Sequence, residues 1–582
     1  MREDLIFSYE RENRAVVDDH VSGQGCSVYM DRTRLADAAA MMLEAGYALD
    51  DITLLDVSEG IQGQYRFTHW DKQDRVTIRT IAPHDEACFP SIAGVYPGAD
   101  WHERENMDFY PVNYEDHPNP TPLLLPDDMA EEHPLEKREK DRVSYFDIVP
   151  GQKFIECDSD HMLCSCALNL HSAKKDEFPL RCIPELRFKQ PDMPANMRLE
   201  VEDGDFYSKH FETTYSDDRL VLNMGPQHPS THGVLRVVLE LDGEYVIRAE
   251  PVLGYIHRMH EKMGEVKTFH QYLPNMGRVD YLHALAWNHA YCLAVEKLAD
   301  IEVPRRAELI RVITNELNRL SSHLLWWGAY LLDLGAFTPI MYAFEDRERI
   351  MDLLQVITGS RLTYCYFVFG GVTCDVPGDF AERTRSIVHT LRDRLPMFTA
   401  LVTENLILRK RVEDIGVIDP SMCRRYGATG PVLRGAGVAY DVRMNSPYSV
   451  YDELDFEIPV YDGHDAMSRY MVRMDEMAES IKIIEQALDL LDGADDGHII
   501  KKAPNAGFTP PSGEAYAAVE GARGKIGVYV ASDGGKKPYR VKLRAPGFSN
   551  LSLFAECAQG TLLADAVSIL GSLDLVIPEI DR

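Results

Sequence analysis

The pattern of apolar and polar residues predicts an early part built on short strands and a later part built on long helices. The first helix is predicted by apolar residues at helical spacing, namely Leu35, Ala39, Met42 and Leu43. It ends at Gly46, a residue that favours helix termination. Alternating residues then predict strands in ITLLDV, YRFTHW and RVTIRTI, the last two joined by the polar loop 71–74. A helix and strands in so short a stretch predict a compact sheet with helices on one face.

The stretch from 110 to 218 has a different composition, with HPNPTPLLLPDD, a charged HPLEKREKDR run and little periodicity. Such a composition is typical of an extended segment, although a free linker would contain more Gly and Ser. We therefore expect this stretch to mark a domain boundary and much of it to lie over the neighbouring domain.

The second part begins with a hairpin and continues with long helices. Alternating runs flank Asp242-Gly243 and, near the end, Asp533-Gly534-Gly535, so a hairpin is predicted at each. Helical spacing predicts helices at 277–300, 304–333, 343–357, 380–411, 467–491 and 562–573. In the second of these, one apolar stripe contains Leu309, Val312, Ile313, Leu317, Leu320 and Leu324.

The predicted fold class is therefore α+β. A small N-terminal α/β-sheet domain at 1–146 precedes a linker segment with a cysteine cluster at 147–218. A mainly helical bundle domain with peripheral β-hairpins follows at 219–582.

Composition narrows the function. The chain has 582 residues and a formal net charge of −32, which argues against an electrostatic grip on nucleic acid or anionic lipid. The N-terminal sequence has acids among its bases and no apolar run, so we expect no signal peptide and a cytosolic location. No window has the roughly 18 consecutive apolar residues of a membrane helix, so any membrane link is expected to run through other subunits.

The 11 cysteines are odd in number and scattered, a pattern typical of reduced thiols. One cluster stands apart and contains Cys157, Cys164, Cys166 and Cys182. Four soft ligands in one segment are able to hold zinc or an iron-sulfur cluster, but the paired C-x-x-C spacing is missing. Metal binding here is the minor alternative.

The motif GPQHPSTHG at 225–233 places His228 and His232 four residues apart in a turn rich in Gly and Pro. These residue types suit three roles: a structural loop, a ligand or proton site, or a metal site without an obvious third ligand.

Tyr281 lies where the helix predicted at 277–300 begins, and a buried tyrosine bonded to the backbone is its commoner role. Asp333, set among apolar residues in LLDLGAF, needs a partner such as His or Arg, or else caps a helix end. Motifs of hydrolases, zinc proteases, P-loop proteins and dinucleotide-binding enzymes are absent from the sequence. Hydride chemistry is therefore expected elsewhere.

Several long motifs resemble the quinone-pocket (49 kDa-type) subunit of complex I, a membrane-attached NADH:quinone oxidoreductase. In order, they are NMGPQHPSTHGVLRVVLELDGE, GYIHRMHEKMGE, RVDYLHALAWNHAYCLAVEKL, NELNRLSSHLLWWGAYLLDLGAFTP, LRGAGVAYDVR and SDGGKKPYRVKLRAPGF. The resemblance spans Leu220 to Arg582. The first half, through PSIAGVYPGADWHERENMD and a weaker HPLEK, resembles the smaller 30 kDa-type subunit, so the chain resembles a fusion of the two (C/D).

The resemblance implies a fold like the nickel-iron hydrogenase large subunit, but without nickel, because no Cys occupies the matching motifs. It implies that His232 and Tyr281 hydrogen-bond the two carbonyl oxygens of the substrate quinone, and that Asp333 pairs with His232. It places His228 and Arg258 near a 4Fe-4S cluster that a partner holds. This chain itself is expected to hold no cluster and no metal.

The resemblance also implies partners and a location. These partners are an iron-sulfur subunit bearing the terminal cluster, other peripheral-arm subunits and membrane-arm subunits. The chain is expected at the cytoplasmic face of the bacterial inner membrane, inactive alone, as part of a proton-translocating enzyme.

Some positions depart from the family pattern. Thr363 and Val368 stand where many members have His and Arg near the cluster, and Asp108-Phe109-Tyr110-Pro111 replaces D-M-F-G. Two alternatives therefore stay open. One is a non-catalytic scaffold subunit of a divergent complex using another electron donor, and the other is a soluble metalloprotein.

Overall fold

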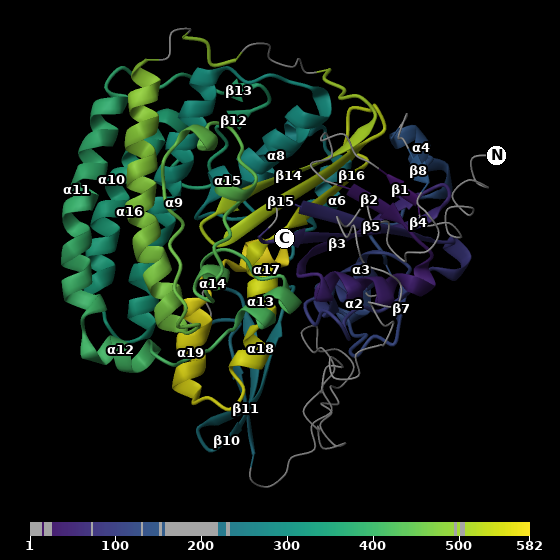
Figure 1. Ribbon diagram of the computed structural model, residues 1–582, viewed down its shortest axis with the longest axis horizontal. Coiled ribbons are helices and arrows are strands. Elements are labelled where there is room, and N and C mark those ends of the chain that lie inside the picture. The colour runs from purple at the N-terminus through teal and green to yellow at the C-terminus, as the bar shows by residue number, and fades with distance from the viewer. Residues whose placement is uncertain are drawn as a thin grey trace.

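The fold is seen in a computed structural model, which describes residues 14–16, 26–71, 74–129, 132–149, 154–156, 219–228, 233–493, 497–500 and 507–582. An N-terminal sheet unit lies beside a larger helical unit, whose bundle of long helices forms the opposite side of the molecule (Figure 1). The predicted α+β class is confirmed.

The N-terminal unit is built on a six-stranded sheet with strand order β3-β4-β5-β2-β1-β8. The strands are β1 (Arg14–Val16), β2 (Cys26–Tyr29), β3 (Tyr47–Val57), β4 (Gly60–His69), β5 (Asp74–Ala82) and β8 (Phe154–Glu156). Only β2 and β5 pair in parallel among these neighbours. The three predicted strands and the predicted first helix, α2 (Leu35–Glu44), are confirmed.

Helix α3 (Ala99–Phe109) also packs on strand β3, and β6 (Cys88–Pro90) pairs with β7 (Asn113–Glu115). In the described residues from 110 to 156, the helices are short: Asp127–Met129, Glu139–Asp141 and α4 (Tyr145–Ile148). Leu123, Leu124, Leu125 and Leu135 are nevertheless buried in the core that both units share. In the described part of the predicted draped segment, Leu124 and Lys137 thus contact the neighbouring unit, at Gly254 and Glu265. Strand β8 instead joins the N-terminal sheet, and 157–218 is outside the described residues.

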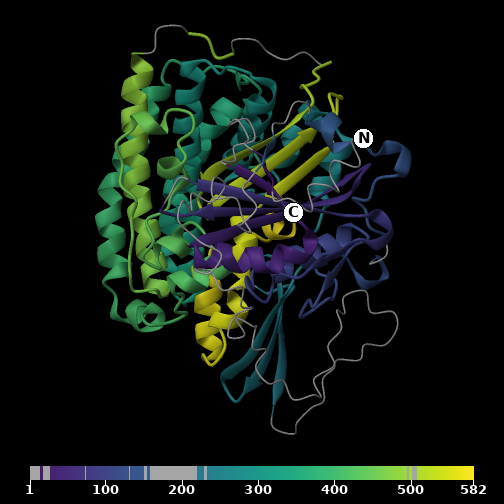
Figure 2. The same cartoon turned by 45° about the vertical axis from the view of Figure 1, so that its right-hand side comes forward.

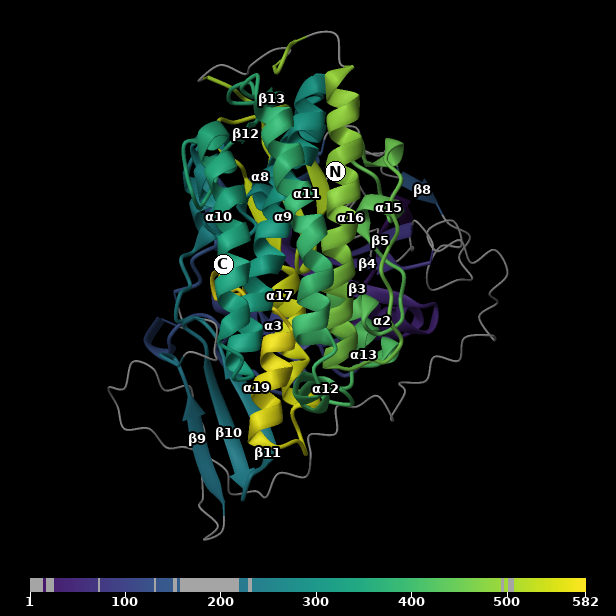
Figure 3. The same cartoon turned by 90° about the vertical axis from the view of Figure 1, so that its left-hand side faces the viewer.

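The C-terminal unit opens with a three-stranded sheet of β9 (Leu220–Met224), β10 (Arg236–Asp242) and β11 (Tyr245–Val252). It projects from the body of the molecule (Figure 3). A second sheet contains β14 (Gly513–Gly521), β15 (Gly524–Ser532) and β16 (Arg540–Arg544). Both predicted hairpins are confirmed, but β14 was not predicted, because its alanines and glycines give a weak strand signal.

The long helices stand side by side (Figure 3). They are α8 (Ala284–Ala299), α9 (Arg305–Asp333), α10 (Thr338–Thr358), α11 (Phe380–Phe398) and α16 (Ala466–Asp492). Shorter helices precede, separate and follow the long ones: α6 (His260–Val266), α7 (Phe269–Met276), α12 (Leu406–Val412), α13 (Pro420–Tyr426), α14 (Pro431–Arg434), α15 (Val442–Asn445), α17 (Pro546–Ser552), α18 (Phe554–Cys557), α19 (Leu563–Ser572) and α20 (Ile577–Asp581). The predicted helices are present, and the additions are α6, α7, α13, α14, α15, α17, α18 and α20.

Helix α9 shows where the apolar pattern is incomplete. Its predicted apolar stripe is buried, but so are the polar side chains on its other faces, including Glu316, Arg319 and His323. The reason is that α9 is enclosed by α10, α16 and α19 and also reaches the end of β14. Its polar residues must therefore find partners inside the protein.

Buried polar contacts join the two units where the strands β3 to β5 face the strands β14 to β16 (Figure 2). Arg79 of β5 pairs with Glu514 of β14, and Lys525 of β15 pairs with Asp50 of β3. The hydroxyl of Tyr539 donates to the carbonyl oxygen of Asp56 at 2.6 Å. The two units consequently share one continuous core.

The Arg79–Glu514 pair predicts a large effect on stability. The substitution Arg79→Met leaves Glu514 buried without its main counter-charge, so the free energy of unfolding is expected to fall by about 3–5 kcal/mol. The control is Arg305→Met, which breaks the exposed pair with Glu453 and should cost less than about 1 kcal/mol. Urea unfolding of the purified variants measures both, and equal effects would contradict the prediction.

Candidate functional site

The loop between β9 and β10 carries the GPQHPSTHG motif, of which the structure describes 225–228 and Gly233. A Cβ at Gly225 would lie 2.0 Å from the carbonyl oxygen of Leu235, so only glycine fits there. His228 is exposed and forms a β-bridge with Gly233. His232 lies outside the described residues, so its contacts stay a prediction.

Tyr281 lies in a turn before helix α8. The sequence predicted that it begins the helix, which is wrong, because α8 begins at Ala284. The cause is Asp280, whose Oδ1 accepts the N–H groups of Leu282 at 2.8 Å and His283 at 3.0 Å and so stabilises the turn. The other oxygen, Oδ2, accepts a hydrogen bond from Arg523 at 2.7 Å.

The phenol of Tyr281 is half-buried and stays protonated at neutral pH. Burial raises its pKa, and the nearby carboxylates Asp280 and Asp574 raise it further, whereas Arg523 and Arg347 act in the opposite direction. Tyr281 therefore presents a neutral O–H group that is able to donate a hydrogen bond.

Three acids lie close to Arg523, which is itself near Tyr281. Arg523 is fully buried and lies 2.7 Å from Asp280, 3.7 Å from Asp574 and 3.9 Å from Glu579. Burial and the neighbouring Asp280 raise the pKa of Glu579 to about 8, although Arg523 lowers it. The carboxyl group of Glu579 thus holds a proton at neutral pH, as expected when three buried acids share one guanidinium.

Asp333 is the last residue of α9 and is half-buried. Arg523 contacts Ser322 of the same helix at 3.2 Å. Asp333 lies about 16 Å further along the helix axis than Ser322. Since the C-terminal end of a helix disfavours negative charge, Asp333 does not stabilise the helix as an N-cap would. Exposed apolar residues surround this end of the helix: Leu332, Phe337, Met341, Tyr342 and Phe344.

Arg258 lies in the loop between β11 and α6 and is exposed. The next residue, Met259, has a left-handed backbone with φ of 53°, which is uncommon for a side chain of this kind. Thr363, one of the positions that depart from the family pattern, also has a left-handed backbone. The carbonyl oxygen of Val368 accepts a hydrogen bond from Arg311 at 2.8 Å.

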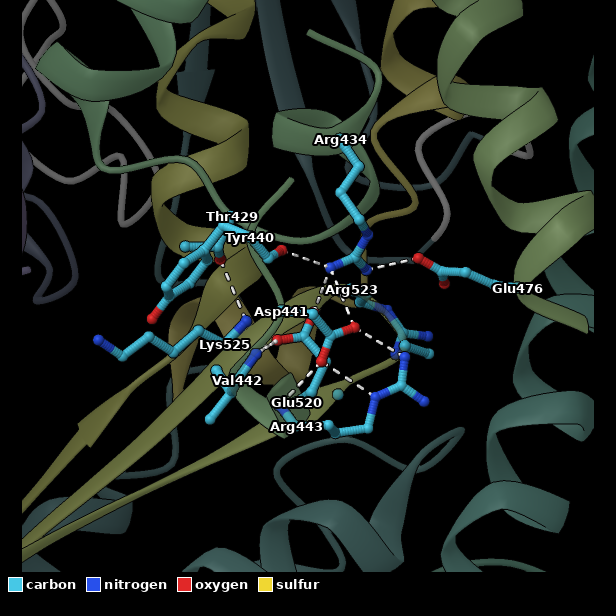
Figure 4. A network of polar contacts seen from close by, with 12 residues as sticks. Thr429, Arg434, Tyr440, Asp441, Val442, Arg443, Glu476, Glu520, Arg523 and Lys525 are labelled. Atoms are coloured by element: carbon cyan, nitrogen blue, oxygen red, sulfur yellow. Dashed lines mark hydrogen bonds and ion pairs between the residues drawn. The ribbon is translucent and has the colours of Figure 1, made fainter. Parts of the chain in front are cut away.

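A buried network of charges, which the sequence did not predict, lies between α9, α16 and β14 (Figure 4). Arg434 contacts Glu476 at 2.5 Å and Glu520 at 2.9 Å, and His323 contacts Glu476 at 2.9 Å. Burial alone would raise the pKa of Glu476, but Arg434 and His323 hold it well below its usual range. Arg523 contacts Ser322, the residue before His323, at 3.2 Å, so the charges near Tyr281 and this network reach neighbouring positions of α9.

The network extends to Glu316, which pairs with Arg319 at 2.9 Å and with Arg443 at 3.2 Å. Burial would raise the pKa of Glu316, yet the two arginines lower it to about 2. The charged residues inside the apolar run NELNRLSSHLLWW were the available signal for this network.

Within the described ranges there is no group of three or more residues suited to hold a metal. Cys157, Cys164, Cys166 and Cys182 lie outside those ranges. In the same described part of the chain, none of the helices is both long enough and apolar enough to span a membrane.

Comparison with known proteins identifies the family. Residues 333–582 match the model of the respiratory-chain NADH dehydrogenase 49 Kd subunit, and residues 28–142 match that of the 30 Kd subunit. The D-type NADH-quinone oxidoreductase subunit of Desulfotalea psychrophila is 60% identical over 63% of this chain and 98% of its own length. The chain belongs to this family of complex I subunits. It combines both subunit types in one polypeptide and is part of a multisubunit respiratory oxidoreductase.

Other similar proteins agree. A D-type NADH-quinone oxidoreductase subunit of Opitutus terrae is 57% identical over 63% of this chain and 91% of its own length. A chain of the archaeal membrane-bound sulfane sulfur reductase, a respiratory membrane complex, superposes with a TM-score of 0.61. It is 39% identical and covers 63% of this chain and all of its own. The predicted family resemblance is thereby confirmed.

The acids around Arg523 predict a pH-dependent stability. Between about pH 4.5 and 8 the folded chain keeps the Glu579 proton that the unfolded chain releases, so stability falls as pH rises. The substitution Glu579→Gln removes this contribution. Relative to the unsubstituted chain, the variant should gain stability from pH 5 to 8, by at most about 1.4 kcal/mol per pH unit. Urea midpoints at several pH values measure this gain, and the exposed Glu404→Gln is the control. A difference that stays constant with pH would contradict the prediction.

Proposed function

We propose that this chain forms the quinone-reduction site of a proton-translocating NADH:quinone oxidoreductase. Tyr281 carries this proposal, because it is a protonated phenol held in a defined turn and backed by buried charges. In the proposed site, Tyr281 and His232 donate hydrogen bonds to the two carbonyl oxygens of the quinone, and Asp333 pairs with His232.

The chemistry needs two electrons and two protons to convert the quinone to the quinol. The electrons arrive singly from a 4Fe-4S cluster that the iron-sulfur partner holds, with His228 and Arg258 near it. Each electron leaves negative charge on the quinone oxygens, and donors already directed at these oxygens stabilise that charge and supply protons. Glu579 is a protonated acid in the same group of charges as Asp280 and Arg523.

The exposed apolar residues around Asp333 support a partner at this end of the molecule. Apolar side chains exposed together are typical of protein interfaces. We assign this surface to the iron-sulfur subunit, so that the quinone site forms between the two chains and the single chain is inactive. Other peripheral-arm subunits and membrane-arm subunits complete the assembly.

The proposed location is the cytoplasmic face of the bacterial inner membrane, with no membrane helix in this chain. Coupling to ion movement is proposed to act through protonation or conformational changes around His232 and Asp333. These steps require the whole complex.

A second candidate function keeps the assembly but changes the electron donor. The similarity to a chain of a sulfane sulfur reductase complex supports a divergent assembly, because that respiratory complex is named for the sulfur compound that it reduces and not for NADH or quinone. Thr363 and Val368, which replace residues usual near the cluster, point in the same direction. In the extreme form of this alternative, the chain is a non-catalytic scaffold.

Substitution of Tyr281 distinguishes a catalytic subunit from a scaffold. In the assembled complex, Tyr281→Phe removes the proposed proton donor and should lower the rate of quinone reduction by about 10²-fold. Tyr461→Phe, on a hydroxyl that bonds Asp475 on α16 at 2.5 Å, should leave the rate unchanged. If both variants reduce quinone at the normal rate, Tyr281 has no catalytic role.

Affinity purification of the tagged chain from gently solubilised membranes tests the assembly. We expect an iron-sulfur subunit and membrane subunits to co-purify, with inhibitor-sensitive quinone reduction. Assays with different electron donors then separate the two candidate functions. Recovery of the chain alone would contradict both.

Elemental analysis tests the metalloprotein alternative. Because the proposal places the cluster in the partner, the chain purified without partners should contain no stoichiometric zinc, nickel or iron. Stoichiometric metal in this sample would favour the alternative and would direct attention to Cys157, Cys164, Cys166 and Cys182.

A further inference from the structure

The loop that carries Arg258 is held on both sides of this residue, although Arg258 itself is exposed. Its neighbour His257 is half-buried, and the N–H of His257 donates to the carbonyl oxygen of Gly254 at 3.1 Å. One ring nitrogen of His257, Nε2, lies 2.8 Å from the sulfur of Met259. The contacts that Gly254 and His257 make with the rest of the protein therefore determine the conformation of the loop at Arg258.

The N-terminal unit provides the contacts on one side of this loop. The ring of Phe109, at the end of α3, stacks on the ring of His257 with centroids 5.4 Å apart and planes at 22°. A Cβ at Gly254 would lie 2.3 Å from the carbonyl oxygen of Leu124, so the two backbones touch. These contacts come from the 30 kDa-type part of the chain and reach the loop of the 49 kDa-type part.

Asp108 fixes the segment that touches Gly254. Its buried carboxylate accepts hydrogen bonds from the backbone N–H groups of Leu123, Leu124 and Leu125, at 3.0, 2.7 and 3.1 Å. Asp108 matches the Asp of the family's D-M-F-G motif, whereas Phe109 stands in place of its Met. The departing residue Phe109 thus has a structural role at this loop, through its ring contact with His257.

Asp581 of α20 provides the contacts on the other side of the loop. One of its carboxylate oxygens accepts the backbone N–H of Ile256 at 2.9 Å. Its carbonyl oxygen lies 2.6 Å from Nδ1 of His257, which donates to it. His257 is therefore clamped between a ring of the N-terminal unit and a carbonyl group of α20.

An ion cluster ties α20 to the same N-terminal helix. Arg582 bonds both carboxylate oxygens of Glu105 at 2.7 Å, and Lys542 contacts Glu105 at 2.8 Å. Glu261, in the first turn of α6, lies 3.7 Å from Arg582. All four residues are buried, so this ion cluster couples the positions of α3, α6 and α20.

We propose that Phe109 and Asp581 are positioning residues for Arg258, and that the N-terminal unit thereby sets the reduction potential of the partner's cluster. The inference rests on the proposed function, in which Arg258 lies beside that cluster. A cationic side chain near the cluster favours its reduced form, and the strength of this effect falls with distance. Loss of the Phe109 ring on His257 and of the Asp581 carboxylate that accepts from Ile256 loosens the loop. Arg258 then moves away, so the cluster becomes harder to reduce.

The test is an EPR-monitored redox titration of the cluster in the purified complex. Phe109→Leu combined with Asp581→Ala should shift the midpoint potential to more negative values, in the direction of the shift caused by Arg258→Gln and by at least half its size. Phe109→Tyr and Asp581→Asn keep the stacked ring and the acceptor oxygen, so they should keep the original potential. The control is Arg305→Met, which breaks the exposed pair with Glu453 away from the loop and should keep the original potential.

The outcomes separate the inference from the proposed function. If Arg258→Gln shifts the potential and the double variant does not, the inference is overturned and the proposed function stands. If Arg258→Gln causes no shift, the proposed position of Arg258 fails. If the double variant does not assemble, Phe109→Leu and Phe109→Tyr are compared alone, and equal potentials overturn the inference.

Discussion

The interior of this protein contains arginines that water does not reach, and their charge has to be balanced by carboxylates brought from distant parts of the chain. Arg434 is balanced by Glu476 of α16 and Glu520 of β14, and Arg523 by Asp280 beside α8. An isolated charge in such an environment would cost several kcal/mol. The helices, the second sheet and the N-terminal unit can therefore be arranged in few ways that leave these groups satisfied.

The same constraint explains the chemistry available at Tyr281. The charges behind it are fixed before any ligand arrives, so they need no rearrangement when charge develops on a bound molecule. The turn that holds Tyr281 depends on Asp280, and Asp280 depends on Arg523. A residue far from the phenol in sequence thus determines where its hydroxyl points.

Local patterns predicted the elements well and their surroundings poorly. Alternation and helical spacing located the strands of the first sheet and helix α9, because each pattern reflects one face packed on a core. They did not reveal that α9 is buried on its polar faces too, since the partners of Glu316 and His323 on other helices lie on α15 and α16. Similarly, the turn at Tyr281 could not be predicted, because it requires an acid, Asp280, whose counter-charge Arg523 lies in the distant turn between β14 and β15. Arg258 was identified through the family motifs and Asp333 through its apolar neighbours in LLDLGAF, and neither signal gives the surroundings of these residues.

The shared core of the two units has a consequence for how the protein is made. Docking buries Arg79, Lys525 and Arg582 against acids of the other unit, so a partly docked state would leave charges dehydrated without partners. In a single polypeptide the two units are always produced in equal numbers, and their encounter does not depend on cellular concentration.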